Sequence, residues 1–180
     1  LLTPDTSSDY SNFFYSIRGA REFWDWRTEQ LKNRVVHSLS FIEDAFNSMV
    51  GIQVLKDTAL QITLDRPVPY FLDQVALAVC SPVYRPAVEG WVVDNDKQTV
   101  LIENGWFHFD ENSIIKKNWT SVDETTGRIQ QQYLWARPEY IVCNGPFFLE
   151  SWRYKRDMWM ERNPFYHSPE ITSIDSIHGI

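Results

Sequence analysis

The sequence predicts an α+β fold, and two kinds of hydrophobic spacing carry that prediction. Apolar residues recur at helical spacing through residues 17–31 and again through residues 42–49. Further along, apolar and polar side chains alternate in residues 52–64 and 147–160, which is the spacing of β-hairpins. Helices and hairpins are therefore expected in one chain.

The first part of the chain is expected to be mainly helical. Residues 8–15 suit a short helix, and residues 17–31 suit a longer one in which Gly19 is a weak point. Ser40-Phe41-Ile42-Glu43 fits a capping box, in which a serine and a glutamate satisfy free backbone N–H groups at a helix start. Gly51 would end the helix that begins there.

Strand pairs are expected to dominate the rest of the chain. Pro82 and Pro86 bracket a turn, because proline cannot continue a regular hydrogen-bonded element. Four hairpins are predicted, at residues 52–64, 92–102, 114–135 and 147–160, with a short helix at residues 70–76.

The last hairpin carries the most aromatic stretch, "CNGPFFLESWRYKRDMWMERNPFYH", residues 143–167. Alternation places Phe147 and Leu149 on one face, and the polar break at residues 153–157 has the length of a hairpin loop. Asn163-Pro164 is expected to leave the sheet as a turn, because proline lacks a backbone donor. Burial in a core hairpin is the ordinary explanation for so many aromatic side chains.

Composition and charge narrow the class of protein. With 180 residues, 43% hydrophobic and 23% charged, the chain should fold as one or two globular domains. Its net charge of -7 argues against nucleic acid as a partner. No apolar run reaches the roughly 18 residues of a membrane span, and the first residues do not form a signal peptide. Cys80 and Cys143 can pair or remain buried thiols.

Sequence motifs for catalysis are missing. There is no HExxH, paired CxxC, GxSxG, P-loop or GxGxxG, so we predict no enzyme, no cofactor and no metal site. His108, Asp110 and Glu111 are the best metal-ligand candidates, but structural sites generally need more ligands. Two alternatives stay open: eight tryptophans suit a carbohydrate-binding β module, and Asp123-Glu124 gives weaker support to a glycoside hydrolase fragment.

Four ordered segments resemble family 5 extracellular solute-binding proteins, the dipeptide and oligopeptide receptors of ABC importers. "LLTPDTSSDYS", "IRGAREF" and "IQVLKDTALQITLDRPVPYF" resemble the family's "RLLDPxTxSPYA", "IKGAEEY" and "VKALDDYTLEVTLxxPxPYF". Residues 143–167 are similar to "NGPYxLxxWxxxxxxxLxRNPxYW", with His167 in place of the usual tryptophan. The matching positions are Asn144, Gly145, Pro146, Phe147, Leu149, Trp152, Met160, Arg162, Asn163, Pro164 and Tyr166.

The resemblance implies a piece of a bilobal periplasmic-binding-protein fold, type II and cluster C-like, with a mixed sheet. It implies the end of an inserted small domain at residues 1–66 and part of the ligand-binding lobe at residues 67–180. Compared with the family, residues 90–139 are expected to form an atypical hairpin-rich insertion. The implied function is to capture peptides or a related solute in an interlobe cleft and deliver it to the ABC permease, without catalysis. The implied location is periplasmic or extracellular, with membrane association through the permease or a lipid anchor elsewhere.

The resemblance also implies where the ligand binds. In relatives the asparagine of the "NG" motif lies near the cleft and hydrogen-bonds ligand backbone; Asn144 matches it, with Cys143 and Gly145 beside it. An amide both donates and accepts, which suits a peptide group, and Gly145 would let backbone approach closely. A simple turn role for Asn144 stays open, as do nickel complexes, heme or oligosaccharides as ligands. Residues assigned to packing are Pro146, Trp152, Arg162, Asn163, Pro164 and Tyr166.

Overall fold

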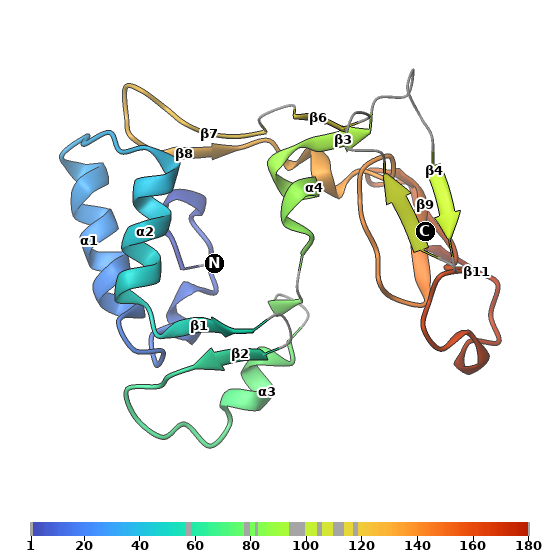
Figure 1. Ribbon diagram of the computed structural model, residues 1–180, viewed down its shortest axis with the longest axis horizontal. Helices are drawn as coiled ribbons and strands as arrows, with labels where there is room; N and C mark the ends of the chain where they lie inside the picture. Colours follow the sequence, from blue (N-terminus) through green and yellow to red (C-terminus); the bar gives the residue numbers. More distant parts are fainter. Residues whose placement is uncertain are drawn as a thin grey trace. The chain divides into compact units, whose positions relative to one another are not determined.

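The computed structural model describes the chain in several stretches, and between residues 91 and 116 it describes the backbone alone. The described residues are 2–56, 59–77, 80–81, 83–93, 100–103, 106–109, 114–116 and 119–179. The α-helices, labelled in Figure 1, are α1 (Ala20–Lys32), α2 (Leu39–Met49), α3 (Phe71–Val75) and α4 (Arg85–Glu89). The 3-10 turns are η1 (Pro4–Thr6), η2 (Ser11–Phe14), η6 (Tyr133–Ala136) and η7 (Pro169–Ile171). Strands are β1 (Ile52–Leu55), β2 (Ala59–Ile62), β3 (Trp91–Val93), β4 (Val100–Glu103), β5 (Trp106–Phe109), β6 (Ile114–Lys116), β7 (Thr120–Val122), β8 (Ile129–Gln131), β9 (Phe147–Arg153), β10 (Asp157–Arg162) and β11 (Ser176–Gly179).

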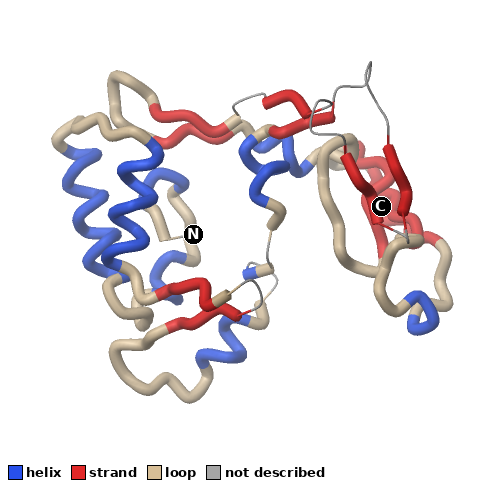
Figure 2. The backbone as a smooth tube through the Cα atoms, in the orientation of Figure 1, coloured by secondary structure: helices blue, strands red, loops and turns tan. Residues whose placement is uncertain are grey.

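The chain's contacts divide it into two compact units. One contains residues 1–82 and 121–131, and the other contains residues 83–120 and 132–180. The first unit holds both long helices, while after α4 the described elements are strands and short 3-10 turns (Figure 2). The α+β class is confirmed, and the domain boundary expected after residue 66 stays a prediction.

The core of the first unit forms where α1 and α2 lie side by side (Figure 1). Phe23 on α1 is only 2% exposed and meets Phe46 of α2 edge-on, with ring centroids 5.3 Å apart. Ile42, four residues before Phe46, is buried on the same face of α2. Other buried members of this core are Phe14, Ile17, Ala20, Val50 and Phe71.

Helix α2 begins earlier than its sequence pattern indicates. Ser38 is the N-cap, and its Oγ accepts a hydrogen bond from the Phe41 backbone N–H at 3.2 Å. The capping box expected at Ser40 is therefore wrong: Ser40 lies inside the first turn, and its hydroxyl contacts that of Ser38 at 3.0 Å. The helix ends at Met49, with Val50 rather than Gly51 at its C-cap.

The hairpin predicted at residues 52–64 and the short helix after it are confirmed. Strands β1 and β2 pair antiparallel with Ile52 opposite Ile62, and Leu64 forms an isolated bridge to Ile17. That bridge ties the hairpin to the segment before α1. Helix α3 follows at Phe71 as its apolar spacing predicts, and the helix expected at residues 8–15 is the short 3-10 turn η2.

Strand pairing in the middle of the chain differs from the prediction. Strand β3 pairs with β6, whereas β4 pairs with β5, so residues 92–93 and 100–102 do not form a hairpin with each other. Strand β7 pairs with β8 close to the expected third hairpin. Short alternating runs show which residues suit a strand but not which strand is the partner. Pro82 lies outside the described residues, and Pro86 is the second residue of α4 rather than part of a turn.

A buried ion pair connects the N-terminal segment to the turn between β7 and β8. Asp5 and Arg27 both have fully buried side chains, and Arg27 Nη2 donates to Asp5 Oδ1 at 2.7 Å. The same nitrogen donates to the Gly127 carbonyl at 2.5 Å, while the Ile129 backbone N–H donates to Asp5 at 2.7 Å. Two segments far apart in sequence are thus held by one carboxylate and one guanidinium.

The Asp5–Arg27 pair should make the stability of the first unit depend on acid pH. Burial raises the pKa of Asp5, but hydrogen bonds from Arg27 and Thr3 outweigh it, so the pKa lies below its ordinary value of 3.8. The unfolded chain then binds the proton more readily, so this contribution to stability is complete above about pH 4 and is lost as the pH falls through the folded-state pKa.

We expect the free energy of unfolding in urea to fall between neutral pH and about pH 3, with a shallower slope in Asp5→Asn. That variant should also be less stable at neutral pH, since an amide cannot balance the buried guanidinium. Equal acid slopes in the two proteins would contradict the role given to Asp5.

Candidate ligand-binding loop

The candidate site lies at the entry to a three-stranded antiparallel sheet in the second unit, with strand order β11-β10-β9. The aromatic hairpin is confirmed: β9 and β10 pair with Phe147 opposite Arg162 and Arg153 opposite Asp157. The register shifts between Trp159 and Met160, which leaves one extra residue, Glu150, on β9 as a bulge. Strand β10 ends at Arg162, so Asn163-Pro164 stops the strand as predicted.

The segment that enters β9 is residues 143–146, and Asn163 holds it. Asn163 is 7% exposed, and its Nδ2 donates to the Gly145 carbonyl at 2.9 Å and to the Cys143 carbonyl at 3.4 Å. Its backbone N–H donates to the Pro146 carbonyl at 2.8 Å. Asn163 therefore holds one carbonyl before Asn144 and two carbonyls after it. We call residues 143–146 the entry loop.

The side chain of Asn144 is not used in the packing of the entry loop. Its side chain is exposed, and it makes no hydrogen bond with any residue that the structure describes. Gly145 has open space around it: a Cβ added there would meet none of the described atoms within 4 Å. Cys143 is partly buried and is a free thiol, as is Cys80. The entry loop therefore presents a free amide beside an uncovered stretch of backbone.

The other residues of the motif anchor the chain that follows β10. Arg162 donates from Nη2 to the Pro169 carbonyl at 2.9 Å and also to the Thr172 carbonyl, and its backbone N–H donates to the Asp175 carbonyl at 2.8 Å. Tyr166 closes the turn at Pro164, because its backbone N–H donates to the Asn163 carbonyl at 3.2 Å. The packing roles assigned to these residues stay a prediction.

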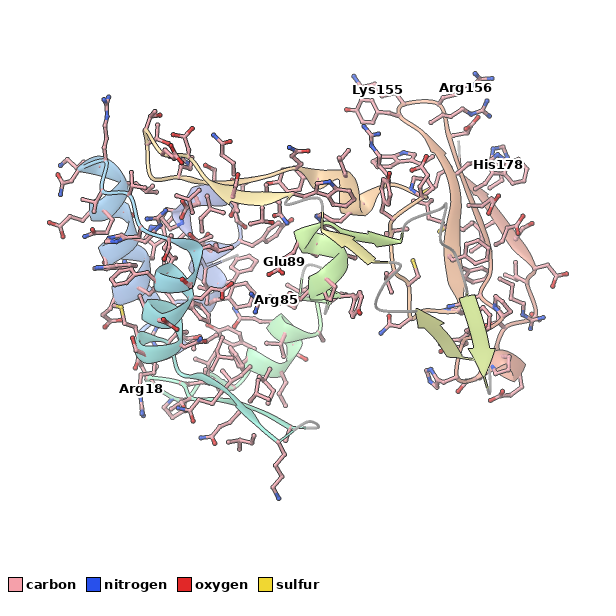
Figure 3. The ribbon with its side chains drawn as sticks, turned by 45° about the horizontal axis from the view of Figure 1, so that its top comes forward. Arg18, Arg85, Glu89, Lys155, Arg156 and His178 are labelled. Atoms are coloured by element: carbon pink, nitrogen blue, oxygen red, sulfur yellow. The ribbon has the colours of Figure 1, made fainter. Side chains whose placement is uncertain are left out.

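The far end of the hairpin is basic and exposed. Figure 3 shows Lys155 and Arg156 projecting from the turn between β9 and β10, where Lys155 has a left-handed φ of 58°. Arg153 donates from Nε to Asp157 Oδ1 at 2.6 Å, and this bond holds the pKa of Asp157 below its ordinary value. The Arg153–Asp157 ion pair therefore closes a hairpin turn whose tip lies in solvent.

Trp152 lies near this end of β9 and away from the entry loop. It lines a groove of about 620 Å³ together with residues 137–139 and 148–154. No motif predicts this groove, because residues 137–139 belong to none of the segments that resemble the family. Cys143, Asn144 and Gly145 are not among the groove's lining residues, so the groove and the entry loop are separate features of the second unit.

The geometry gives little support to a carbohydrate platform. Among the tryptophans whose side chains are described, Trp152 and Trp159 are the exposed ones, at 49% and 39%. Trp152 is opposite Met158, whereas Trp159 is opposite Ser151, so the two indoles lie on opposite faces of the sheet. Trp159 stacks on His178 of β11 with ring centroids 4.0 Å apart.

The candidate catalytic carboxylate Asp123 belongs to a turn, and two of the candidate metal ligands are not described. Asp123 Oδ1 accepts hydrogen bonds from the Thr125 and Thr126 backbone N–H groups at 2.9 and 2.8 Å, which caps a turn. These bonds, led by that from the Thr125 hydroxyl, keep the pKa of Asp123 well below its ordinary value. Asp110 and Glu111 lie outside the described residues. In the part of the chain that is described, no three potential metal ligands gather.

Asn163 is the site residue whose role sequence reasoning did not find. It was expected to form a turn before Pro164, and it does so: its Oδ1 accepts from the Phe165 backbone N–H at 3.0 Å. The signal present in the sequence was the readiness of asparagine to bond neighbouring backbone. Nothing local indicates the bonds to residues 143 and 145, which lie 20 and 18 positions earlier.

Comparison with known proteins identifies the family. The family model of bacterial extracellular solute-binding proteins, family 5 (middle region), matches residues 1–178. The chain belongs to this family. Family 5 proteins are solute-binding proteins, which are non-enzymatic components of transport. None of the described helices has the length and apolarity needed to cross a bilayer.

Family 5 relatives differ in the ligands that their names state. The periplasmic oligopeptide-binding protein OppA of Salmonella typhimurium is 26% identical over 128 residues, which are 71% of this chain and 16% of that protein. The probable deoxycholate-binding periplasmic protein YgiS of Escherichia coli is 22% identical over the same shares. In fold, the chain is similar to the oligopeptide-binding protein OppAIV of Borrelia burgdorferi, with a TM-score of 0.58, 24% identity, and coverage of 98% of this chain and 24% of that one. The chain therefore spans a quarter or less of these relatives.

Proposed function

We propose that this chain forms part of the ligand-binding lobe of an ABC importer receptor that captures short peptides. The match of the family 5 model across residues 1–178 carries the proposal, and the oligopeptide-binding relatives favour peptides over other solutes. The proposed receptor is bilobal and contains a mixed sheet, whereas the pairs β1–β2, β9–β10 and β10–β11 of this chain are antiparallel. It works in the periplasm or outside the cell and delivers its ligand to permease subunits, held near the membrane by them or by a lipid anchor.

Within this lobe we propose that the entry loop contacts the ligand. Asn144 supports the proposal because its amide is exposed and has no partner among the described residues. An amide that donates and accepts can pair with the N–H and the carbonyl of any peptide bond, so it does not depend on the ligand's side chains. Gly145 would let the ligand backbone approach where a side chain would intervene. Cys143 completes the loop on its other side.

The proposed contact predicts a loss of affinity in Asn144→Ala. In the receptor, meaning the whole reading frame that carries these residues, the substitution should weaken peptide binding by about 1 to 3 kcal/mol, because a desolvated hydrogen bond is lost. Titration calorimetry measures this loss. The stability of the receptor should change by no more than about 0.5 kcal/mol, since Asn144 is exposed and unbonded.

Asn47→Ala is the matched control, because Asn47 is an exposed asparagine on α2 in the first unit. It should leave peptide affinity unchanged. Wild-type affinity in Asn144→Ala would show that the entry loop does not contact the ligand.

The substrate class is tested by native mass spectrometry of the receptor purified under gentle conditions. A ladder of short-peptide masses on the protein supports the proposal. A bile-acid mass, the ligand class named for the YgiS relative, would keep the receptor role and replace the peptide, as would a sugar or a metal chelate.

A further inference from the structure

Asn163 uses its whole carboxamide on backbone groups. Both hydrogen bonds from Nδ2 go to the entry loop, at Gly145 and Cys143, and Oδ1 accepts from the Phe165 N–H. Unlike exposed Asn144, it is 7% exposed. A turn before proline needs only the bond to Phe165. The two bonds to the entry loop go beyond that turn and act on a second segment of the chain.

These two bonds fix the residues on either side of Asn144. The carbonyls of Cys143 and Gly145 are both directed to one nitrogen, and the Pro146 carbonyl is held by the Asn163 backbone N–H. Residues 141–146 belong to no strand or helix, so no ladder of backbone hydrogen bonds orders Asn144. Asn163 supplies that order from a neighbouring strand end.

We propose that Asn163 is a positioning residue that holds the entry loop in its ligand-receiving conformation before the ligand arrives. The inference rests on the proposed contact between Asn144 and peptide. A loop that is free before binding must lose backbone entropy when the ligand orders it, and this loss lowers affinity. Because Asn163 holds the loop, its backbone entropy is already lost when the protein folds, and ligand binding does not have to supply it. The same bonds also restrict the orientation of Asn144, since the carbonyls of the residues on both sides of it are hydrogen-bonded.

The test compares Asn163→Asp and Asn163→Ala in the receptor. Asn163→Asp keeps the shape and an acceptor for Phe165 but replaces the Nδ2 donors with an oxygen that repels the Cys143 and Gly145 carbonyls. Asn163→Ala removes the same donors without adding charge. Asn47→Asp is the control for charge, at an exposed helix position. The titrant is the member of a tri- to pentapeptide library that native mass spectrometry finds most abundant on the wild-type receptor.

We expect each Asn163 variant to bind this peptide about tenfold more weakly, and Asn47→Asp to bind as wild type. A role confined to stability is separated by a double-mutant cycle with Asn144→Ala. In the Asn144→Ala background the Asn163 variants should change affinity less than about twofold, whereas their effect on the denaturation midpoint should be the same in both backgrounds. Fully additive losses of affinity would overturn the positioning role.

A measurement without ligand separates this inference from the proposed function. Gly145 precedes Pro146, so labelling glycine carbonyl carbon and proline nitrogen limits the NMR spectrum of the receptor to its Gly-Pro pairs, and the signal that Gly145→Ala removes is that of the Gly145 carbonyl. That signal should shift in both Asn163 variants, and the wild-type Asn163 side-chain amide protons should exchange slowly with solvent. An unmoved signal or free exchange overturns the inference. If Asn144→Ala binds peptide as tightly as wild type, the proposed contact is overturned. If Asn144→Ala binds more weakly but the Asn163 variants bind as wild type, only the positioning role is overturned.

Discussion

Arg27→Ala should lower the free energy of unfolding by about 3 to 5 kcal/mol, because it leaves the Asp5 carboxylate buried without its counter-ion. Arg27 and Asp5 both have side chains at 0% exposure, and Arg27 Nε and Nη2 donate to the two carboxylate oxygens at 2.9 and 2.7 Å. The Gly127 carbonyl loses its donor as well. Urea denaturation of the 180-residue chain, followed by tryptophan fluorescence, measures the loss.

Arg21→Ala is the control, because Arg21 forms an ion pair of the same chemistry on the same helix. Its side chain is 59% exposed, and it bonds Asp25 at 3.0 Å. Since an exposed pair of this kind contributes about 0.5 kcal/mol or less, this variant should unfold close to wild type. If the two arginine variants lost similar amounts of stability, the Asp5–Arg27 pair could not be buried as described.

Gly19→Ala should cost about 3 kcal/mol or more through two effects that each cost about 1 to 3 kcal/mol. Gly19 is the N-cap of α1 and has a φ of 70°, a left-handed conformation that strains any residue with a Cβ. A Cβ placed there would also lie 1.8 Å from the carbonyl oxygen of Met49, the last residue of α2. Both helices would have to move apart, and thermal denaturation should show a lower midpoint.

Gly145→Ala provides the matched comparison for stability. Gly145 has no left-handed φ, and none of the described atoms lies within 4 Å of the Cβ that alanine would add. Its free energy of unfolding should stay within about 1 kcal/mol of wild type. A loss as large as that of Gly19→Ala would mean that the entry loop is covered by protein rather than open to a ligand.

Local sequence predicted the elements that depend on the spacing of apolar side chains. The hairpins that contain β1–β2 and β9–β10 follow from alternation, and α1 and α3 follow from helical spacing. The pattern misjudged Gly19 as a weak point within a helix, because spacing alone does not show that α1 starts after it. It also chose Ser40 over Ser38 as the cap, since two nearby serines are equally able to cap.

Motif resemblance went further than spacing, because four segments match the family in the same order and are together a stronger signal than any one of them. The sequence by itself determined the α+β class and membership of family 5, and it predicted residues 143–145 as the place where the ligand binds. The partners of β3 and β4 were not determined, because alternation marks a strand without naming its neighbour.

Tertiary structure alone decided which polar groups meet. Asp5 finds Arg27 and the Gly127 loop, and Asn163 finds the carbonyls of Cys143 and Gly145. In each case the partners are distant in sequence, and a buried polar group must be bonded wherever the fold has carried it. Apolar spacing records which side chains avoid water, which is a local property. The choice of partner for a buried donor depends on the path of the whole chain, and so the candidate site was located by sequence but explained only by the fold.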